Sequence, residues 1–356
     1  MEDKNNNKIL ISGNEAIAQG AIDAGCRFYA GYPITPQNEL TAYMSEHMKQ
    51  AGGVFIQAES EISAISMVYG ASGCGFRAMT SSSSPGVSLK QEGISYIAAA
   101  QLPAVIVNMM RGGPGLGNIA PAQSDYFQAT KGGGHGDFHC LVLAPSNVQE
   151  AYDLMSDAFD LADKYRNPVI ILGDGMLGQV MEPLEAKSEK RKAKKFKKPW
   201  ALTGCKGRPA NVVKSFYMAD GALEKFNLIL QKKYRSMRQK EQRCAVSFIS
   251  DAKLIIVAYG SMARIAEGAV NTLREQGKKV GLIRPVTLWP FPEKIFKQLT
   301  LKNKRLKFLA VEMSYGQMVE DVRLSVSGKA SVEFLGRAGG GIPTEEEIIK
   351  KIKKIC

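Results

Sequence analysis

Paired cysteines are missing from this sequence. Its six cysteines stand far apart, with no C-x-x-C spacing, at positions 26, 74, 140, 205, 244 and 356. This distribution argues against a disulfide framework and against a structural zinc or iron–sulfur site held by this chain alone. It predicts a protein of a reducing cytoplasm.

Long apolar runs are also missing. No stretch approaches the ~20 residues that a membrane-spanning helix needs. The polar, acidic start MEDKNNNKILISG does not resemble a secretory signal, so we expect no membrane partner. With 356 residues, 45% hydrophobic and 23% charged, the chain has the composition of a globular protein and the length for two domains.

The excess of positive charge is local. The formal net charge is +13, and residues 187–198 contain eight basic residues and one acid, which gives +7 of it. We interpret this stretch as a solvated linker or a basic docking strip; a patch for an acidic partner or for CoA phosphates is the alternative. Only Phe196 and Trp200 accompany the charges, so we expect no nucleic-acid partner.

Strand and helix patterns alternate along the first 185 residues. The run at 102–110 (LPAVIVNMM) is typical of a strand buried on both faces. Asn14 is expected to cap the first helix, and helical spacing starts again at Glu61. Further strands are expected at 8–12, 26–30, 52–60, 139–145 and 168–172, another within 77–86, and a helix over 148–162. This alternation predicts a doubly wound parallel sheet over 1–185.

The pattern weakens and then resumes. Residues 186–250 are expected to form a basic linker and a charged connecting helix. From Asp251 a second α/β domain is predicted over 251–356, with four strands and a last helix that starts in the capping-box pattern Thr344 to Glu347. The predicted fold class is therefore α/β, with two doubly wound parallel-sheet domains.

A stiff turn follows the strand expected at 26–30. Gly31-Tyr-Pro-Ile-Thr-Pro36 places two prolines around Thr35, and each proline restricts its own φ and that of the residue before it. Open α/β sheets place ligand contacts at the carboxyl ends of their strands. From the residues alone, a tight strand-to-helix connection is the preferred interpretation.

Three other polar positions lie where strands are expected to end. Glu59 and Glu61 stand two apart, so an extended chain would place them on one face. The alternative interpretation is that either one is an acid that the helix dipole favours near a helix N-terminus. Arg111 follows the buried strand and precedes RGGPGLG, which lacks the spacing of a phosphate-binding motif. An arginine there is most often a surface or salt-bridge residue.

Several stretches resemble the alpha subunit of thiamine diphosphate-dependent 2-oxoacid:ferredoxin oxidoreductases. They cover most of the chain and read GNEAIAQGAIDAGCRFYAGYPITPQNEL, SEISAISMVYGASGCGFRAMTSSSSPGVSLKQEGISY, NMMRGGPGLG, GGGHGDFHCLVLAPSNVQEA, DKYRNPVIILGDGMLGQVMEP, VAYGSMARIA and VEMSYGQMVEDVRL. Within the family, GGGHGDFHCLVLAP and MSYGQMVEDVRL are most similar to the branched-chain, or 2-oxoisovalerate, type.

The resemblance assigns roles to residues. It implies a pyrimidine-binding-like first domain and a transketolase C-terminal-like second domain. Glu61 would be the acid that activates thiamine diphosphate, because Ser60-Glu61-Ile-Ser-Ala64 matches the family pattern, and Glu59 is kept in reserve. The turn residues Tyr32, Pro33 and Ile34 would contact the cofactor. Thr35 and Arg111 would orient the carboxylate of the substrate.

The resemblance also implies partner subunits. Enzymes of this cofactor class bind magnesium through a GDG followed by an asparagine, but Gly173-Asp-Gly175 has none before Asn211. We interpret it as a strand-end turn. A beta subunit would then carry Mg2+ and the diphosphate site, and gamma and delta subunits the iron–sulfur clusters. His135 and His139 are expected to be structural.

The expected reaction is oxidative decarboxylation of a branched-chain 2-oxoacid. CO2 would leave, CoA would take the acyl group, and electrons would pass to ferredoxin through the clusters. The alternatives are the same reaction on 2-oxoglutarate or another 2-oxoacid such as indolepyruvate, and a non-catalytic scaffold that assembles the complex. A dianionic substrate would require one more cation in the pocket.

Overall fold

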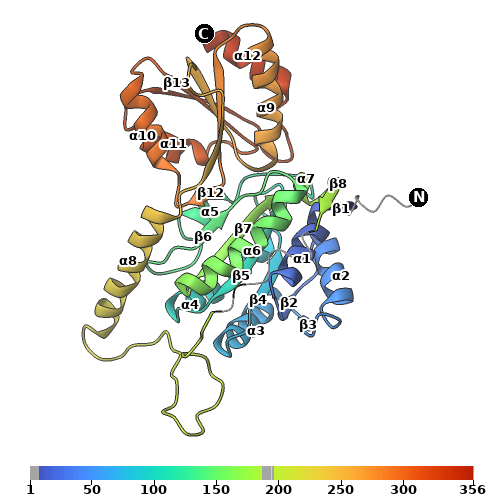
Figure 1. The fold of residues 1–356 in the computed structure, drawn as a ribbon, viewed down its shortest axis with the longest axis vertical. Coiled ribbons are helices and arrows are strands. Elements are labelled where there is room, and N and C mark those ends of the chain that lie inside the picture. Colours follow the sequence, from blue (N-terminus) through green and yellow to red (C-terminus); the bar gives the residue numbers. More distant parts are fainter. Residues whose placement is uncertain (1–7, 187–193, 195, 356) are drawn as a thin grey trace.

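A computed structural model describes residues 8–186, 194 and 196–355. Most of the basic stretch at 187–198 therefore lies outside the described residues. The described part forms two α/β domains joined by a long helix, α8 (Figure 1). No helix among the described residues is long and apolar enough to cross a membrane.

The first domain is built on a seven-stranded sheet. Its strands follow the order β12-β6-β7-β5-β4-β2-β3, all parallel except β12. Their bounds are β2 Phe28–Gly31, β3 Val54–Gln57, β4 Ala78–Ser82, β5 Ala104–Met110, β6 Leu141–Leu143, β7 Pro168–Asp174 and β12 Thr287–Trp289. Every residue of β5 and β7 is buried, as their apolar runs predict.

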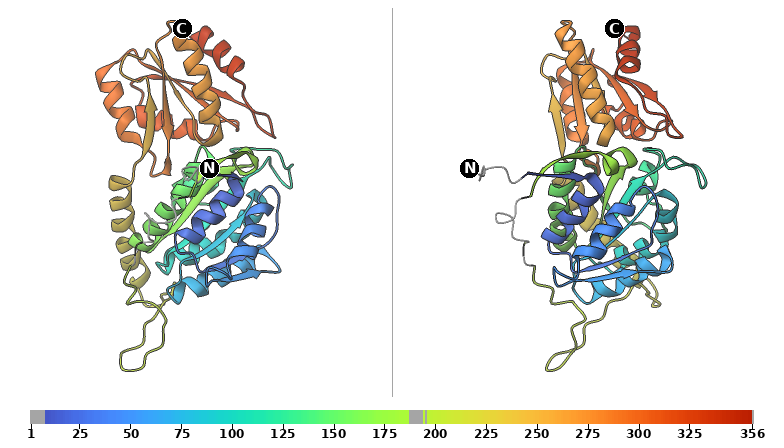
Figure 2. Two further views of the ribbon diagram at one scale, coloured as in Figure 1. Left: turned by 45° about the vertical axis from the view of Figure 1, so that its right-hand side comes forward. Right: turned by 90° about the vertical axis from the view of Figure 1, so that its right-hand side faces the viewer.

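Helices cover both faces of this sheet. The helices α1, α2 and α6 lie on one face and α3 and α4 on the other (Figures 1 and 2). Their bounds are α1 Gly13–Asp23, α2 Asn38–His47, α3 Glu61–Gly73, α4 Ser84–Ala99 and α6 Val148–Tyr165, with the short helices α5 Tyr126–Thr130 and α7 Gly175–Gln179. The predicted doubly wound arrangement is confirmed.

The first strand pattern and the first helix cap differ from expectation. Strand β1 (Lys8–Ser12) pairs antiparallel with β8 (Met181–Glu185) in a separate two-stranded sheet. Ser12 caps α1 in a capping box with Glu15, so the expectation that Asn14 is the cap is wrong. Ser12-Gly-Asn-Glu15 carries the capping-box spacing. Asn14, two residues after the cap, is turned inward and fully buried.

The second domain has a five-stranded sheet in the order β14-β13-β10-β11-β9. Its elements are β9 Cys244–Ser247, β10 Leu254–Val257, α9 Gly260–Glu275, β11 Val280–Pro285, α10 Glu293–Lys302, β13 Lys307–Glu312, α11 Met318–Val326, β14 Ser331–Gly336 and α12 Glu345–Ile355. Four strands are parallel, and β9 pairs antiparallel with β11. The capping box expected at Thr344 and Glu347 is present.

The two domains exchange strands at their border. Strand β12, from the second half of the chain, pairs with β6 of the first sheet, and β9 joins the second sheet before residue 251. The connecting helix α8 (Ala222–Lys240) lies beside the first domain, and residues 199–221 form an extended loop at the end remote from the second domain (Figures 1 and 2). The division at residues 185 and 250 remains a prediction.

The carboxyl edge of the first sheet faces the second domain, and Gln123 links the two. Its side chain is fully buried. The Gln123 backbone N–H donates to the Met313 carbonyl (2.8 Å), and its side-chain amide donates to the Tyr259 carbonyl (2.9 Å) and accepts from the Met313 N–H (3.1 Å). One side chain thus satisfies two backbone groups of the other domain.

We predict that Gln123→Leu, which keeps the size of the side chain but not its amide, destabilises the chain by about 2–4 kcal/mol because two buried backbone groups lose their partners. Thermal unfolding of the full chain measures this. Gln50→Leu, at an exposed position, is the matched control. Equal melting temperatures for the two variants would contradict the assignment.

Candidate active site

The turn predicted from Gly31 to Pro36 stands at the carboxyl edge of the first sheet, directly after β2. Its peptide bond before Pro36 is cis. Tyr32, Pro33 and Thr35 are exposed and Ile34 is half-buried. Residues on both sides therefore hold the backbone while the tip of the turn is open to a ligand.

Two sets of hydrogen bonds hold this turn. The Asn14 side-chain amide donates to the Pro36 carbonyl (2.7 Å) and to Glu39 (2.8 Å). Below the turn, the Tyr29 hydroxyl lies 2.6 Å from the Ser81 hydroxyl, which donates to the side-chain oxygen of Gln37 (2.5 Å). Burial raises the pKa of Tyr29 to about 12, so this network keeps its protons at neutral pH.

Glu61 is the first residue of α3, and only 6% of it is exposed. Its carboxylate points toward the first turn of α4, where a Cβ added to Gly86 would lie 2.5 Å from Glu61 Oε1 and 2.1 Å from Ser82 Oγ. No residue in the described part of the chain donates a hydrogen bond to this carboxylate. Glu61 is thus a buried acid that also benefits from the positive end of α3.

Glu59 is placed differently. It is exposed and accepts a hydrogen bond from the Ser63 hydroxyl, and this bond lowers the pKa of its carboxyl group. The expectation that Glu59 and Glu61 share a face is wrong because α3 begins at Glu61 and ends the extended chain there. The structure therefore separates the two acids.

Arg111 comes to the turn from the end of β5. It is 6% exposed, and its guanidinium donates to the Thr35 carbonyl (3.0 Å) and to the Leu116 carbonyl (3.1 Å). Its backbone N–H donates to the Ser84 hydroxyl (3.1 Å). The ends of β2, β4 and β5 thus meet around one arginine, whose Nε has no partner among the described residues.

Asp174, in the GDG sequence, is occupied within the fold. It caps α7 by accepting from the N–H groups of Met176 (3.1 Å) and Leu177 (3.0 Å), and it accepts from the Ser261 hydroxyl (2.8 Å). Burial raises the pKa of this carboxyl group. The sequence is a strand-end turn, as interpreted. Over residues 8–186, 194 and 196–355, no three His, Cys, Asp or Glu side chains lie together as a metal site would require.

The two histidines pack against aromatic rings. His139 stacks on Trp289 with ring centres 4.4 Å apart, and burial lowers the pKa of its imidazole. His135 meets Tyr96 edge-on at 5.8 Å. Neither approaches the carboxyl edge, so both have structural surroundings.

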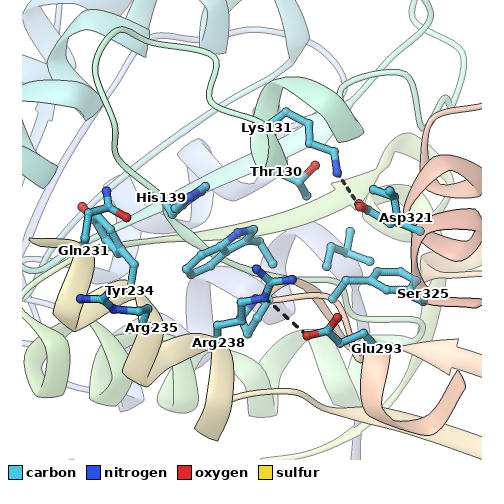
Figure 3. A pocket seen from close by; sticks show the side chains of 15 residues that line it. Thr130, Lys131, His139, Gln231, Tyr234, Arg235, Arg238, Glu293, Asp321 and Ser325 are labelled. Carbon is cyan, nitrogen blue, oxygen red and sulfur yellow. Dashed lines mark hydrogen bonds and ion pairs between the residues drawn. The ribbon is translucent and has the colours of Figure 1, made fainter. Parts of the chain in front are cut away.

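A cavity of about 370 Å³ lies elsewhere, between α8, β12 and α11 (Figure 3). Its walls include His139 and Trp289, and its charges are partly paired: Lys131 with Asp321, and Arg238 with Glu293 at 3.5 Å. None of the site residues predicted from the sequence lines it. We assign it no role in the chemistry.

The sequence analysis did not predict that Lys90 is buried near the candidate site. This lysine is fully buried in α4, and its Nζ has no hydrogen-bond partner among the described residues. Its signal in the sequence is the spacing from Gly86 and Gly93, which places all three on one face of α4.

A two-domain α/β protein with a buried carboxylate, a buried guanidinium and an open turn at one sheet edge has the features of a cofactor-dependent enzyme subunit. Residues 19–241 match the family model "Pyruvate flavodoxin/ferredoxin oxidoreductase, thiamine diP-bdg", and residues 252–348 match "Pyruvate:ferredoxin oxidoreductase core domain II". The chain belongs to the 2-oxoacid:ferredoxin oxidoreductase family, as the resemblance predicted.

Similar proteins include two archaeal subunits. Ketoisovalerate oxidoreductase subunit VorB of Methanothermobacter marburgensis is 49% identical over 98% of this chain and 97% of its own length. 2-Oxoglutarate synthase subunit KorA of the same organism is 37% identical over 96% of this chain and 98% of its own length. Both are named as subunits, so the relatives act within larger assemblies.

Solved structures confirm the fold class. The 2-oxoglutarate:ferredoxin oxidoreductase of Magnetococcus marinus, solved with 2-oxoglutarate, coenzyme A and succinyl-CoA, superposes with a TM-score of 0.86 at 28% identity. The match covers 98% of this chain and 65% of that one. A split-gene transketolase superposes with a TM-score of 0.60 at 13% identity, which shows similarity of fold alone.

The residues present suit one half of thiamine diphosphate. The unpartnered carboxylate of Glu61 can bond a ring nitrogen, and the hydroxyl group of Ser82, which faces the same side of Gly86, is buried without a partner. Such orphaned polar groups are costly unless a ligand satisfies them. The described residues offer no comparable acid set for a diphosphate-bound metal ion.

We predict that Gly86→Ala reduces 2-oxoacid-dependent dye reduction on the order of a hundredfold without unfolding the chain. The added methyl displaces the mobile ends of Glu61 and Ser82, and small misplacements of reacting groups cost about that much. Gly70→Ala is the matched control, since nothing lies within 4 Å of its Cβ. A fully active Gly86→Ala variant with native stability would contradict the placement of Glu61.

Proposed function

We propose that this chain is the alpha subunit of a branched-chain 2-oxoacid:ferredoxin oxidoreductase, which oxidatively decarboxylates a substrate such as 2-oxoisovalerate. The higher identity to ketoisovalerate oxidoreductase subunits, 49% against 37% for the 2-oxoglutarate synthase subunit, supports this substrate class. The observation that carries the catalytic role is the buried Glu61 carboxylate without a hydrogen-bond donor.

Glu61 holds and moves one proton in this proposal. Thiamine diphosphate, when bound, supplies a nucleophilic carbon that adds to the 2-oxo group and allows CO2 to leave. Glu61 would share a proton with a nitrogen of the cofactor's pyrimidine ring, and its buried position would strengthen that hydrogen bond. Tyr32, Pro33 and Ile34, in the turn after β2, would contact the cofactor.

Arg111 and Thr35 orient the substrate. Two carbonyl groups hold the guanidinium in place. Because carbonyl groups are neutral, they do not neutralise its positive charge, and it can attract the substrate carboxylate. The exposed hydroxyl of Thr35 is free to donate to the same carboxylate. One charge and one neutral hydroxyl group suit a substrate with a single carboxylate.

Other subunits complete the enzyme in this proposal. A beta subunit brings Mg2+ and the diphosphate contacts, gamma and delta subunits bring iron–sulfur clusters, and CoA and ferredoxin are the co-substrate and the electron acceptor. Large apolar side chains near the same edge support a contact there: Leu116 is 81% exposed, Ile119 67% and Tyr315 83%. The free state of the described cysteines supports a cytoplasmic location.

We predict that Glu61→Gln, assayed in the assembled complex, lowers turnover on the order of 10²–10⁴-fold because the amide cannot share the required proton. Glu59→Gln, two residues away and exposed, should stay within about twofold of the parent. Dye reduction with 2-oxoisovalerate, 2-oxoglutarate and CoA measures both. If the Glu61→Gln complex assembles with undiminished activity, the scaffold alternative is correct.

We predict that the chain purified alone contains no iron and shows no cluster absorption, while the complex with its companion subunits shows both. Among the described residues no three cysteines lie close enough together to hold a cluster. Metal analysis and visible spectra of the two preparations are the measurement. Stoichiometric iron in the isolated chain would overturn the proposed division among subunits.

A further inference from the structure

A lysine with no contact to solvent lies beside the proposed catalytic acid. Lys90 is in the second turn of α4 and is 0% exposed, and its ammonium group has no hydrogen-bond partner among the described residues. Lysine is almost never fully buried unless it is paired. Its position therefore requires an electrostatic explanation.

The packing of α4 on α3 places Lys90 next to Glu61. A Cβ added to Gly86 would lie 2.5 Å from Glu61 Oε1, and one added to Gly93 would lie 2.5 Å from Ile65 Cγ2. Lys90 is four residues after the first glycine and three before the second, so it lies on the same face of the helix. The side chain thus enters the contact between α3 and α4 that also contains Glu61.

Glu61 is the charged group that acts on Lys90. Burial lowers the pKa of Lys90 from 10.5 to about 8, and the charge of Glu61 works against that shift. Other elements packed against α4 include β5, which has no titratable residue, and β7, whose Asp174 is bonded to Ser261. The loop after α5 also meets α4, and its titratable His135 contacts Tyr96 in the last turns of the helix. Asp125, near the start of α4, is engaged by the side chains of Ser84 and Asn108.

We propose that Lys90 is a positioning residue for Glu61: its enclosed ammonium group attracts the Glu61 side chain and holds it turned toward the carboxyl edge of the sheet. This inference rests on the role proposed for Glu61. Two opposite charges in a region of low dielectric interact far more strongly than they would at the surface, and removal of one leaves the other uncompensated. The competing explanation is that Lys90 only fills space with its aliphatic stem.

The pH dependence of stability separates these explanations. The folded-state pKa of Lys90, about 8, lies below the 10.5 of an exposed lysine. Between these values the unfolded chain binds a proton that the folded chain has lost, so stability rises with pH over that window. The melting temperature of the full parent chain should therefore rise, relative to Lys90→Met, as the pH increases from 8 toward 10.

The charge interaction between Lys90 and Glu61 is tested by comparing Lys90 with Lys90→Met again, this time in a Glu61→Gln background. Without the Glu61 charge the pKa of Lys90 falls further, so the rise relative to Lys90→Met should begin at a lower pH. An identical window with and without Glu61 would overturn the inference. If Lys90→Met does not fold, Lys90→Gln serves in the same cycle.

Lys233 offers a matched control. Burial lowers its pKa to about 7, but it lies on α8 and donates to the Arg166 carbonyl (3.2 Å). The pH range over which the parent gains melting temperature relative to Lys233→Met should not change when Glu61 is replaced. A shift of that window equal to the one at Lys90 would mean that Glu61→Gln acts through general loss of structure, and would overturn the specific pairing.

The assembled enzyme gives a second readout. Lys90→Met should lower kcat by about tenfold, a part of the usual contribution of acid–base groups, with little change in the KM for the 2-oxoacid. Unchanged kcat would overturn the inference and leave the proposed function intact. Full activity of Glu61→Gln would overturn the proposed function, while the shift of the stability window could still be observed.

Discussion

A carboxylate enclosed without a hydrogen-bond donor is the constraint on which this site depends. A buried charge without a partner costs several kcal/mol, so the fold must compensate Glu61 by other means. It does so with the positive end of α3 and, in our proposal, with the ammonium group of Lys90. Both act through space, and neither occupies the carboxylate oxygens with a hydrogen bond, so these stay available to a ligand. A conventional salt bridge at hydrogen-bond distance would have occupied them.

The remaining polar groups at this edge fix the backbone and leave the site open. Asn14 and Arg111 donate to the carbonyl groups of Pro36 and Thr35, which holds the turn after β2 against the ends of α1 and β5. Ser84 connects the start of α4 to Arg111 and Asp125. Because these contacts join elements distant in the sequence, the turn is positioned before any ligand arrives, and a ligand does not lose affinity in ordering it.

Much of the fold follows from local patterns. The apolar run of β5, the helical spacing of α6 and the capping box before α12 each determine an element without help from the rest of the chain. The exchange of β12 into the first sheet does not, because its pairing with β6 depends on where the second domain docks. The inward turn of Asn14 is similarly non-local: Ser12 and Asn14 are both good caps, and the contact with Pro36 selects between their roles.

The residues of the candidate site are likewise of two kinds: those that the sequence indicates and one that only the fold reveals. The resemblance identified Glu61, Thr35 and Arg111, and the fold brings the last two into contact at one sheet edge with the first buried nearby. Periodicity alone could not show that Lys90 is buried, since a lysine on a helix is normally assigned to the solvent side. Only the two glycines that flank it on the α4 face, which allow α3 to approach, indicate that it lies inside.

The placement of Asp174 bears on why one chain is insufficient under the proposed function. Its Oδ1 accepts from two backbone N–H groups and from the Ser261 hydroxyl, so Asp174 caps α7 and joins the two domains. A metal ion prefers several oxygen ligands within one small space, and no three His, Cys, Asp or Glu side chains gather in the described part of the chain. In the proposed assembly, burial of exposed apolar side chains such as Leu116 and Tyr315 against a second subunit would remove apolar surface from water.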